Sequence, residues 1–180
     1  EKLMGHKIGA IVAIEPETGE ILCLVSTPSF NPADMVGRQR GKNHMALEQD
    51  PRKPLFNRAL MASYPPGSTF KPAQSLVFLQ EGIIQPSTTF PCYHGFVVPG
   101  LRVGCHSHPS PLPLVPALAT SCNSYFCWGL YRMIDNKKYL NSDSALTVWK
   151  DHMVSMGFGY KLGIDLPGEK RGLIPNSKFY

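Results

Sequence analysis

The hydrophobic positions near the start of the chain fall into two short runs that predict a β-hairpin. Residues 8–14 (IGAIVAI) and 20–26 (EILCLVS) are apolar and partly β-branched, and the segment EPETG joins them. Runs of this kind, bounded by turn-forming residues, are typical of strands. We therefore expect two buried strands. Residues 28–54 are polar and contain Gly and Pro, so a long loop is expected there.

The pattern then becomes mainly helical. A short helix is expected over residues 56–63, and a longer one from about Ser68 to near Gly82. Residues 86–113 carry several prolines and no clear period, which indicates an extended segment. Three further helices are expected over residues 114–120, 125–134 and 145–156. This order favours the α+β class, with helices packed on an antiparallel sheet that is incomplete, because two strands alone are marginal.

Composition and charge narrow the possible functions. The chain has 180 residues, 43% of them hydrophobic and 17% charged, which is enough for one domain with a core. The net charge of +5 is dispersed. The densest basic group, Arg38, Arg40 and Lys42, has no nucleic-acid recognition motif beside it, so we expect a solvated loop and no nucleic-acid partner. No apolar run approaches the roughly 18 residues that a membrane span needs.

The stretch YPPGSTFKP, residues 64–72, places a serine and a lysine three residues apart after a turn-forming segment. If a helix begins at about Ser68, residues i and i+3 share one face, and Ser68 Oγ can meet Lys71 Nζ. A lysine that is neutral can take the proton of a serine, and burial or the positive end of a helix lowers its pKa. On these residues alone, a capping serine and a solvated lysine are the commoner arrangement.

A second motif, Ser121-Cys122-Asn123, lies at the break between two expected helices. Ser121 could pass a proton between Lys71 and a leaving amine, and Asn123 could hydrogen-bond a substrate amide. The spacing by itself is weak evidence, because Ser29-Phe30-Asn31 matches it in a proline-flanked turn.

Together, YPPGSTFKP and SCNSYF resemble the transpeptidase domain of the class B penicillin-binding proteins, whose signature is S-x-x-K, then S-x-N, then K-T-G. The stretches GAIVAIEPETGEILCLVSTPSFNP, NRAL and MGFGYKLGIDLPGE agree with that family in the same order. The elongation-type members, the penicillin-binding protein 2 group, are the most similar. The resemblance implies the penicillin-binding and serine-β-lactamase-like transpeptidase fold.

The resemblance also implies an activity and a setting. It implies a peptidoglycan D,D-transpeptidase that cross-links stem peptides and is acylated by β-lactams, in cell-wall elongation and cell shape. Ser68 would be the nucleophile and Lys71 its base, and Ser121 and Asn123 would line the opposite side of the active site. No cofactor would be needed for catalysis. A membrane glycosyltransferase partner and the periplasmic face of a bacterial inner membrane are implied as well. A non-catalytic scaffold and a penicillin-sensing domain of the same fold remain alternatives.

The chain departs from the family signature at the third motif. Neither K-T-G nor K-S-G is present, and Lys161-Leu162-Gly163 lacks the hydroxyl. We therefore expect residues 1–180 to be a partial transpeptidase domain, made of the N-terminal hairpin, the S-x-x-K helix and the S-x-N helical region. The third motif is expected on a later segment, and these residues could be inactive without it.

The five cysteines fall into two groups. Cys23 and Cys127 lie in apolar segments and are expected in the core. The others lie near histidines, and zinc favours four Cys or His ligands in a tetrahedron. The preferred ligand set for a structural zinc is Cys92, Cys105, His108 and Cys122, with His106 or His94 as substitutes. The alternative left open is a Cys92–Cys105 disulfide, which suits an extracytoplasmic compartment.

Overall fold

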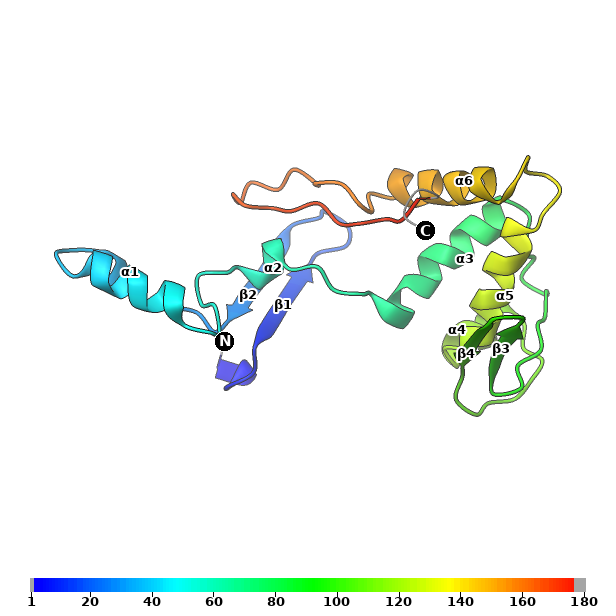
Figure 1. Ribbon diagram of the computed structural model, residues 1–180, viewed down its shortest axis with the longest axis horizontal. Coiled ribbons are helices and arrows are strands. Elements are labelled where there is room, and N and C mark those ends of the chain that lie inside the picture. The colour runs from blue at the N-terminus through cyan, green and yellow to red at the C-terminus, as the bar shows by residue number, and fades with distance from the viewer. Residues whose placement is uncertain (1, 177–180) are drawn as a thin grey trace. The chain divides into compact units, whose positions relative to one another are not determined.

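The computed structural model describes residues 2–176 (Figure 1). It divides into two compact units. The N-terminal unit contains the residues up to Tyr64 together with Gly163–Lys170, and the helical unit contains Pro65–Leu162 together with the residues from Arg171 on. Among the described residues, no helix is both long and apolar enough to cross a membrane.

The N-terminal unit is built on the predicted hairpin. After the short 3₁₀ helix η1 (Lys2–Met4), strands β1 (Gly9–Ile14) and β2 (Ile21–Thr27) pair antiparallel, with Gly9 opposite Thr27 (Figure 1). The prediction that both strands are buried is wrong, since Ile14 is 53% and Leu22 64% exposed. Within this unit the short helix α2 (Arg58–Met61) packs on both strands, and one turn of helix cannot cover both faces of a hairpin.

The predicted loop over residues 28–54 is also wrong. It contains the 3₁₀ helix η2 (Pro32–Met35) and the helix α1 (Arg40–Gln49). Helix α1 has no buried side chain, so no apolar stripe marks it in the sequence. Its contact with η2 includes a hydrogen bond from the Asn43 side chain to the carbonyl of Asp34 at 2.8 Å. The basic residues of this segment are exposed, as expected.

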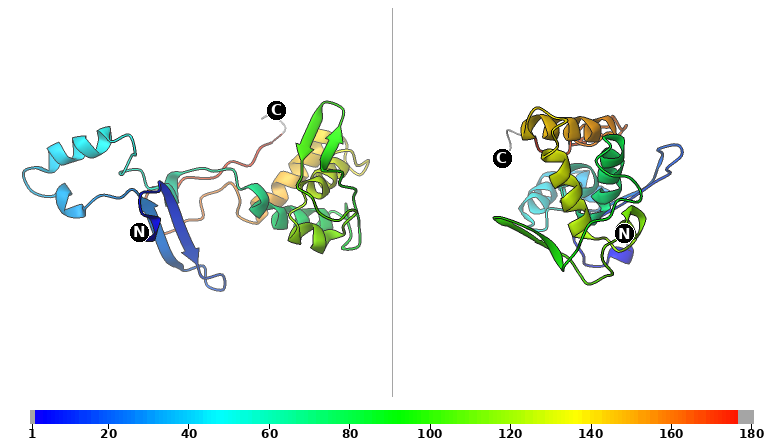
Figure 2. Two further views of the ribbon diagram at one scale, coloured as in Figure 1. Left: turned by 90° about the horizontal axis from the view of Figure 1, so that it is seen from below. Right: turned by 90° about the vertical axis from the view of Figure 1, so that its right-hand side faces the viewer.

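The helical unit holds the core. Its main elements are η3 (Gly67–Phe70), α3 (Lys71–Gln80), α4 (Leu114–Ala119), α5 (Asn123–Ile134) and α6 (Ser142–Ser155). Helix α3 contacts each of α4, α5 and α6 (Figure 2). Phe78 on α3 is fully buried and lies against Gly129 of α5, where an added Cβ would be 2.5 Å from the Phe78 ring. A glycine at this position therefore lets α3 and α5 approach closely.

Residues 86–113 contain a hairpin that the sequence pattern did not reveal. Strands β3 (Gly95–Val98) and β4 (Leu101–Gly104) pair antiparallel and pack on α5 (Figure 2). The buried Phe96 of β3 meets Trp128 of α5 edge to face, with ring centroids 4.8 Å apart. Strands of this length carry too few residues for a clear alternation. As a result, the end of β4 lies next to the first residue of α5.

The C-terminal end of α3 is tied to α6 by a carboxylate. Glu81 accepts hydrogen bonds from Lys138 Nζ at 2.7 Å, the Tyr139 hydroxyl at 2.6 Å and His152 Nε2 at 2.7 Å. These hydrogen bonds lower the pKa of Glu81 to about 2. The side chain is 11% exposed, so solvent screens the contacts only partly.

Replacing Glu81 with glutamine is expected to reduce the free energy of unfolding by about 2 kcal/mol at pH 7. Because the pKa of Glu81 is lower in the folded state, its contribution is present above the ordinary pKa of 4.5 and is lost as the pH falls towards about 2. Urea unfolding at pH 7 and at pH 3 measures the difference. The exposed Asp151 of α6, changed to asparagine, serves as the control. An equal loss at both pH values would contradict the assignment.

Candidate active site

Polar side chains from two distant segments converge in the helical unit. Lys71 is the first residue of α3, and its Nζ lies 3.1 Å from Ser68 Oγ and 3.0 Å from Ser121 Oγ. The same nitrogen lies 2.7 Å from Asn123 Oδ1 and 2.6 Å from the carbonyl oxygen of Ser121. Ser121 Oγ donates to Ser68 Oγ at 2.9 Å. The structure thus brings all four residues proposed from the two motifs into one hydrogen-bonded group.

The local backbone around Ser68 explains its position opposite Lys71. The predicted helix is present, but it begins with the 3₁₀ turn η3, which Gly67 enters with a left-handed φ of +60°. In a 3₁₀ turn, side chains at i and i+3 eclipse each other, which brings the side chains of Ser68 and Lys71 to the same side. Pro72 lies in the first turn of α3, where no backbone donor is needed.

Ser121 reaches the group through an unusual backbone conformation. Its φ is +53°, in the left-handed region that non-glycine residues seldom occupy. Its N–H donates to the carbonyl of Leu118, and the N–H of Cys122 donates to the carbonyl of Ala117, both at 2.9 Å. These bonds close the end of α4 and turn the chain into α5. Strained residues of this kind cost on the order of 1 kcal/mol or more and occur often at functional sites.

Lys71 has the environment of a base. Its side chain is 7% exposed, and burial lowers its pKa, while the neighbouring thiol groups act in the opposite direction. A lowered pKa increases the neutral fraction, which can accept the proton of a hydroxyl. Ser68, by contrast, is exposed. The group therefore combines an accessible hydroxyl with a buried amine, which is the arrangement needed for nucleophilic catalysis.

Asn123 is held by the end of the β3–β4 hairpin. Its side-chain amide donates to the carbonyl of Gly104 at 2.9 Å, while its backbone N–H donates to Cys105 Sγ at 3.3 Å. These contacts leave Oδ1 directed at Lys71. Sequence reasoning missed Gly104 and Cys105 as supports for Asn123. No local pattern marks them, because the contact depends on how the hairpin packs on α5.

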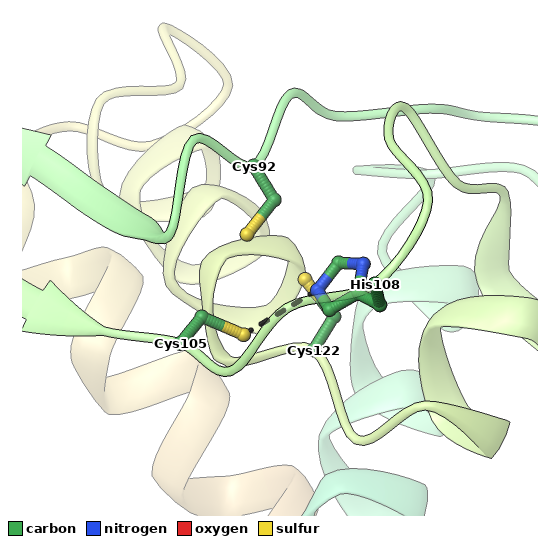
Figure 3. Close-up of side chains that lie close together, drawn as sticks. All are labelled: Cys92, Cys105, His108 and Cys122. Carbon is green, nitrogen blue, oxygen red and sulfur yellow. Dashed lines mark hydrogen bonds between the residues drawn. The ribbon is translucent and has the colours of Figure 1, made fainter.

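Figure 3 shows a cluster of three thiols and one imidazole, and one of the thiols, that of Cys105, accepts the Asn123 N–H. The sulfur atoms and a ring nitrogen of its members all lie within 4.8 Å of one another, and the members are Cys92, Cys105, His108 and Cys122. His108 Nε2 is 3.4 Å from Cys105 Sγ, and its Nδ1 is 2.7 Å from the carbonyl oxygen of Pro109. A carbonyl oxygen only accepts, so Nδ1 donates to it, and in the neutral ring Nε2 then carries the lone pair on the side of Cys105 Sγ.

The chemistry of this donor set fits zinc. Structural zinc sites use Cys₃His sets in which the ligand atoms surround one ion. The pKa of the Cys122 thiol is raised by burial. Burial also raises the pKa of Cys105, but hydrogen bonds from Asn123 and the other neighbours outweigh it and lower that pKa.

The remaining cysteine and histidine predictions have mixed outcomes. His94 and His106, proposed as substitute ligands, are not members of the cluster. His106 instead lies edge to face against His108, with ring centroids 5.4 Å apart. All five cysteines are free thiols, and Cys23 and Cys127 are half-buried rather than fully in the core. Residues 161–163, the imperfect K-T-G, form no strand.

Comparison with known proteins gives the family. The profile of the penicillin binding protein transpeptidase domain matches residues 9–180. The peptidoglycan D,D-transpeptidase MrdA of Acinetobacter baumannii is 36% identical over 99% of this chain and 25% of its own length. MrdA of Escherichia coli K12 is 33% identical over 99% of this chain and 27% of its own length. The chain thus spans about a quarter of the length of these curated relatives.

Solved structures agree with the sequence comparison. Pseudomonas aeruginosa PBP2, solved in complex with WCK 5153, has a TM-score of 0.84 and 29% identity, covering 99% of this chain and 37% of that one. Helicobacter pylori PBP2, solved in complex with MreC, has a TM-score of 0.83 and 31% identity, covering 99% and 32%. These likenesses confirm the predicted α+β transpeptidase fold. The chain belongs to the penicillin-binding protein transpeptidase domain family, within its penicillin-binding protein 2 group.

Proposed function

We propose that this chain carries the nucleophile, the base and the S-x-N motif of a peptidoglycan D,D-transpeptidase. This enzyme would act in cell-wall elongation and be acylated by β-lactams. The observation that carries the proposal is the position of Lys71 Nζ, buried and within 3.1 Å of Ser68 Oγ. The names of the relatives support the reaction class. A non-catalytic scaffold would have no need to keep a buried lysine beside an exposed serine hydroxyl.

The proposed reaction begins with acylation. Ser68 Oγ attacks the carbonyl carbon of the D-Ala-D-Ala bond, and neutral Lys71 takes the hydroxyl proton. The negative charge on the carbonyl oxygen is stabilised in part by the Ser68 backbone N–H. The intermediate then collapses and the C–N bond breaks. Ser121 passes the proton from Lys71 to the departing D-alanine amine, and an ester to Ser68 remains.

The second half-reaction transfers the acyl group. An amine of a neighbouring stem peptide attacks the ester and gives a proton to neutral Lys71, the C–O bond to Ser68 breaks, and Lys71 returns the proton to Ser68 Oγ. Asn123 would hydrogen-bond the substrate amide through its side chain, which Gly104 holds in place. A β-lactam would follow only the first half, with its ring amide in place of the D-Ala-D-Ala bond.

The wider setting of the parent protein is also a proposal. One structural neighbour is PBP2 bound to MreC, and another belongs to a peptidoglycan synthase complex that coordinates polymerization and crosslinking. By analogy, we place the parent protein in an elongation complex with a membrane glycosyltransferase, at the periplasmic face of the inner membrane. Its substrates would be peptidoglycan stem peptides.

Labelling with a fluorescent penicillin tests the proposed function. The 180-residue chain and a form extended through the third motif are labelled, and peptide mass mapping locates the adduct. Label on the peptide that contains Ser68 is expected in the extended form. Label in that form alone would show that the segment with the third motif is required. Absence of label in both forms would favour the scaffold alternative.

We also propose that Cys92, Cys105, His108 and Cys122 hold a structural zinc ion that has no part in bond breaking. Purification under reducing conditions with zinc is expected to give one ion per chain by elemental analysis. Removal by a chelator is expected to lower Tm, because metal binding stabilises only the folded state. His108→Ala should lose the ion, whereas His94→Asn should retain it, since asparagine tolerates the left-handed backbone at that position. Substoichiometric zinc, with Cys92 and Cys105 joined in a disulfide even under these reducing conditions, would contradict this proposal.

A further inference from the structure

The thiols beside Asn123 are close enough to one another to react. The Sγ atoms of Cys92, Cys105 and Cys122 all lie within 4.8 Å, although the residues come from separate segments (Figure 3). Cys92 precedes β3 and Cys105 follows β4, so their thiols approach from the same end of the β3–β4 hairpin. A disulfide has an S–S bond of about 2.05 Å, so its formation requires at least one of the two side chains to move.

Accessibility distinguishes the three sulfurs. Cys105 is half-buried at the end of β4, whereas Cys92 is 9% and Cys122 only 2% exposed. An oxidant from solvent would therefore reach Cys105 first, and access is one of the conditions that decide which thiol reacts. Cys92, whose Sγ lies within 4.8 Å of that of Cys105 and which is more accessible than Cys122, is then placed to complete the bond. Cys122 is the least accessible and caps α5, accepting the Tyr125 N–H at 3.3 Å.

Cys105 is connected to the candidate active site by a direct hydrogen bond. Its Sγ accepts the backbone N–H of Asn123, and the preceding residue, Gly104, accepts the Asn123 side-chain amide. If Cys105 turned towards Cys92, the first bond would be lost and the strand end that provides the second would shift. Asn123 Oδ1 is 2.7 Å from Lys71 Nζ, so the change would reach the base.

We propose that Cys92 and Cys105 form an oxidative modification site, whose disulfide displaces Asn123 and slows acylation of Ser68. The inference rests on the proposed function. With hydrogen peroxide as oxidant, two thiols and one peroxide give one disulfide and two water molecules. With a small disulfide as oxidant, Cys105 forms a mixed disulfide and releases one thiol, and Cys92 then displaces the second thiol.

Metal and oxidation compete for the same sulfurs. A sulfur bonded to zinc as a thiolate is not available for the disulfide, and a disulfide no longer offers two thiolate ligands. The zinc-loaded protein is therefore expected to resist oxidation, and oxidation of the metal-free protein is expected to prevent zinc binding. The state of these four residues would therefore depend both on the zinc concentration and on the amount of oxidant.

The test uses the full-length parent protein, reduced and stripped of metal, with and without hydrogen peroxide or oxidised glutathione. Intact mass is expected to fall by about 2 Da per disulfide, and peptide mapping is expected to join Cys92 to Cys105. The rate of acylation by a fluorescent penicillin is expected to fall at least 10-fold, and a reductant should restore it. Zinc added before the oxidant should prevent both changes.

Matched variants separate this site from the other thiols. For each variant the rate after oxidation is divided by its own rate before oxidation. Cys92→Ser is expected to bring this ratio close to one, because the second thiol is missing. Cys23→Ser, on β2, should behave as the unaltered protein.

Each outcome distinguishes the inference from the function on which it rests. Failure of the free thiols to form the Cys92–Cys105 disulfide, or an unchanged acylation rate once it has formed, overturns the inference and leaves the transpeptidase proposal intact. Absence of acylation in the reduced protein contradicts the transpeptidase proposal itself.

Discussion

Ser68→Ala in the full-length parent protein is expected to abolish covalent labelling by penicillin. In the proposed mechanism Ser68 Oγ is the atom that is acylated, while Ser121 Oγ donates a hydrogen bond to it and the buried Lys71 is assigned as its base. Gel fluorescence and intact mass, followed to long incubation times, measure the loss. The expected effect is complete, because the nucleophile itself is removed.

The control for this experiment is Ser63→Ala, which removes an exposed hydroxyl five residues upstream. It should label at the rate of the unaltered protein. Circular dichroism and thermal unfolding establish that both variants are folded, and Ser68→Ala should be nearly as stable as the unaltered protein because Ser68 is exposed. A Ser68→Ala protein that still carries one penicilloyl group per chain would disprove the assignment of the nucleophile.

Lys71→Met is expected to lower the rate of acylation by about 10²–10⁴-fold, the contribution typical of a general base. Methionine fills much of the buried volume but cannot accept a proton. In the unaltered protein the rate should increase with pH, because more Lys71 becomes neutral. Burial lowers the pKa of Lys71, so this increase should lie at lower pH than for an ordinary lysine. Stopped-flow measurement of penicillin acylation from pH 6 to pH 10 gives both results.

Lys71→Arg distinguishes a base from a fixed positive charge. Arginine keeps the charge but stays protonated at every accessible pH, so it cannot take the proton of Ser68. The rate should be as low as with methionine and should lose its dependence on pH in this range. An arginine variant with the rate of the unaltered protein would show that the charge suffices, and the assignment of Lys71 as base would be wrong.

The sequence alone determined the features that depend on neighbouring residues. The hairpin of β1 and β2 and the positions of α3, α5 and α6 follow from local periodicity and turn residues. The face shared by Ser68 and Lys71 follows from their spacing at the start of a helix. The S-x-N motif and the Cys and His ligand set were also chosen from the sequence, with the family resemblance as support, but their proximity depends on the fold.

Local patterns failed where they were short or polar. Helix α1 buries no side chain, and β3 and β4 are too short for a clear alternation. The exposed side of β1 and β2 could not be foreseen either, because an apolar strand has the same sequence whether or not another element covers it. In each case the information that was missing concerns packing partners rather than the residues themselves.

Only the tertiary structure decided how the site is assembled. The packing of the β3–β4 hairpin on α5 brings Gly104 and Cys105 into hydrogen-bonding contact with Asn123. The turn between α4 and α5 brings Ser121 Oγ into hydrogen-bonding contact with Lys71 Nζ. These residues are far apart in the chain, so their contacts depend on how Phe78 meets Gly129 and how Phe96 meets Trp128. Close packing of buried side chains fixes such distances, and no spacing along the sequence contains them.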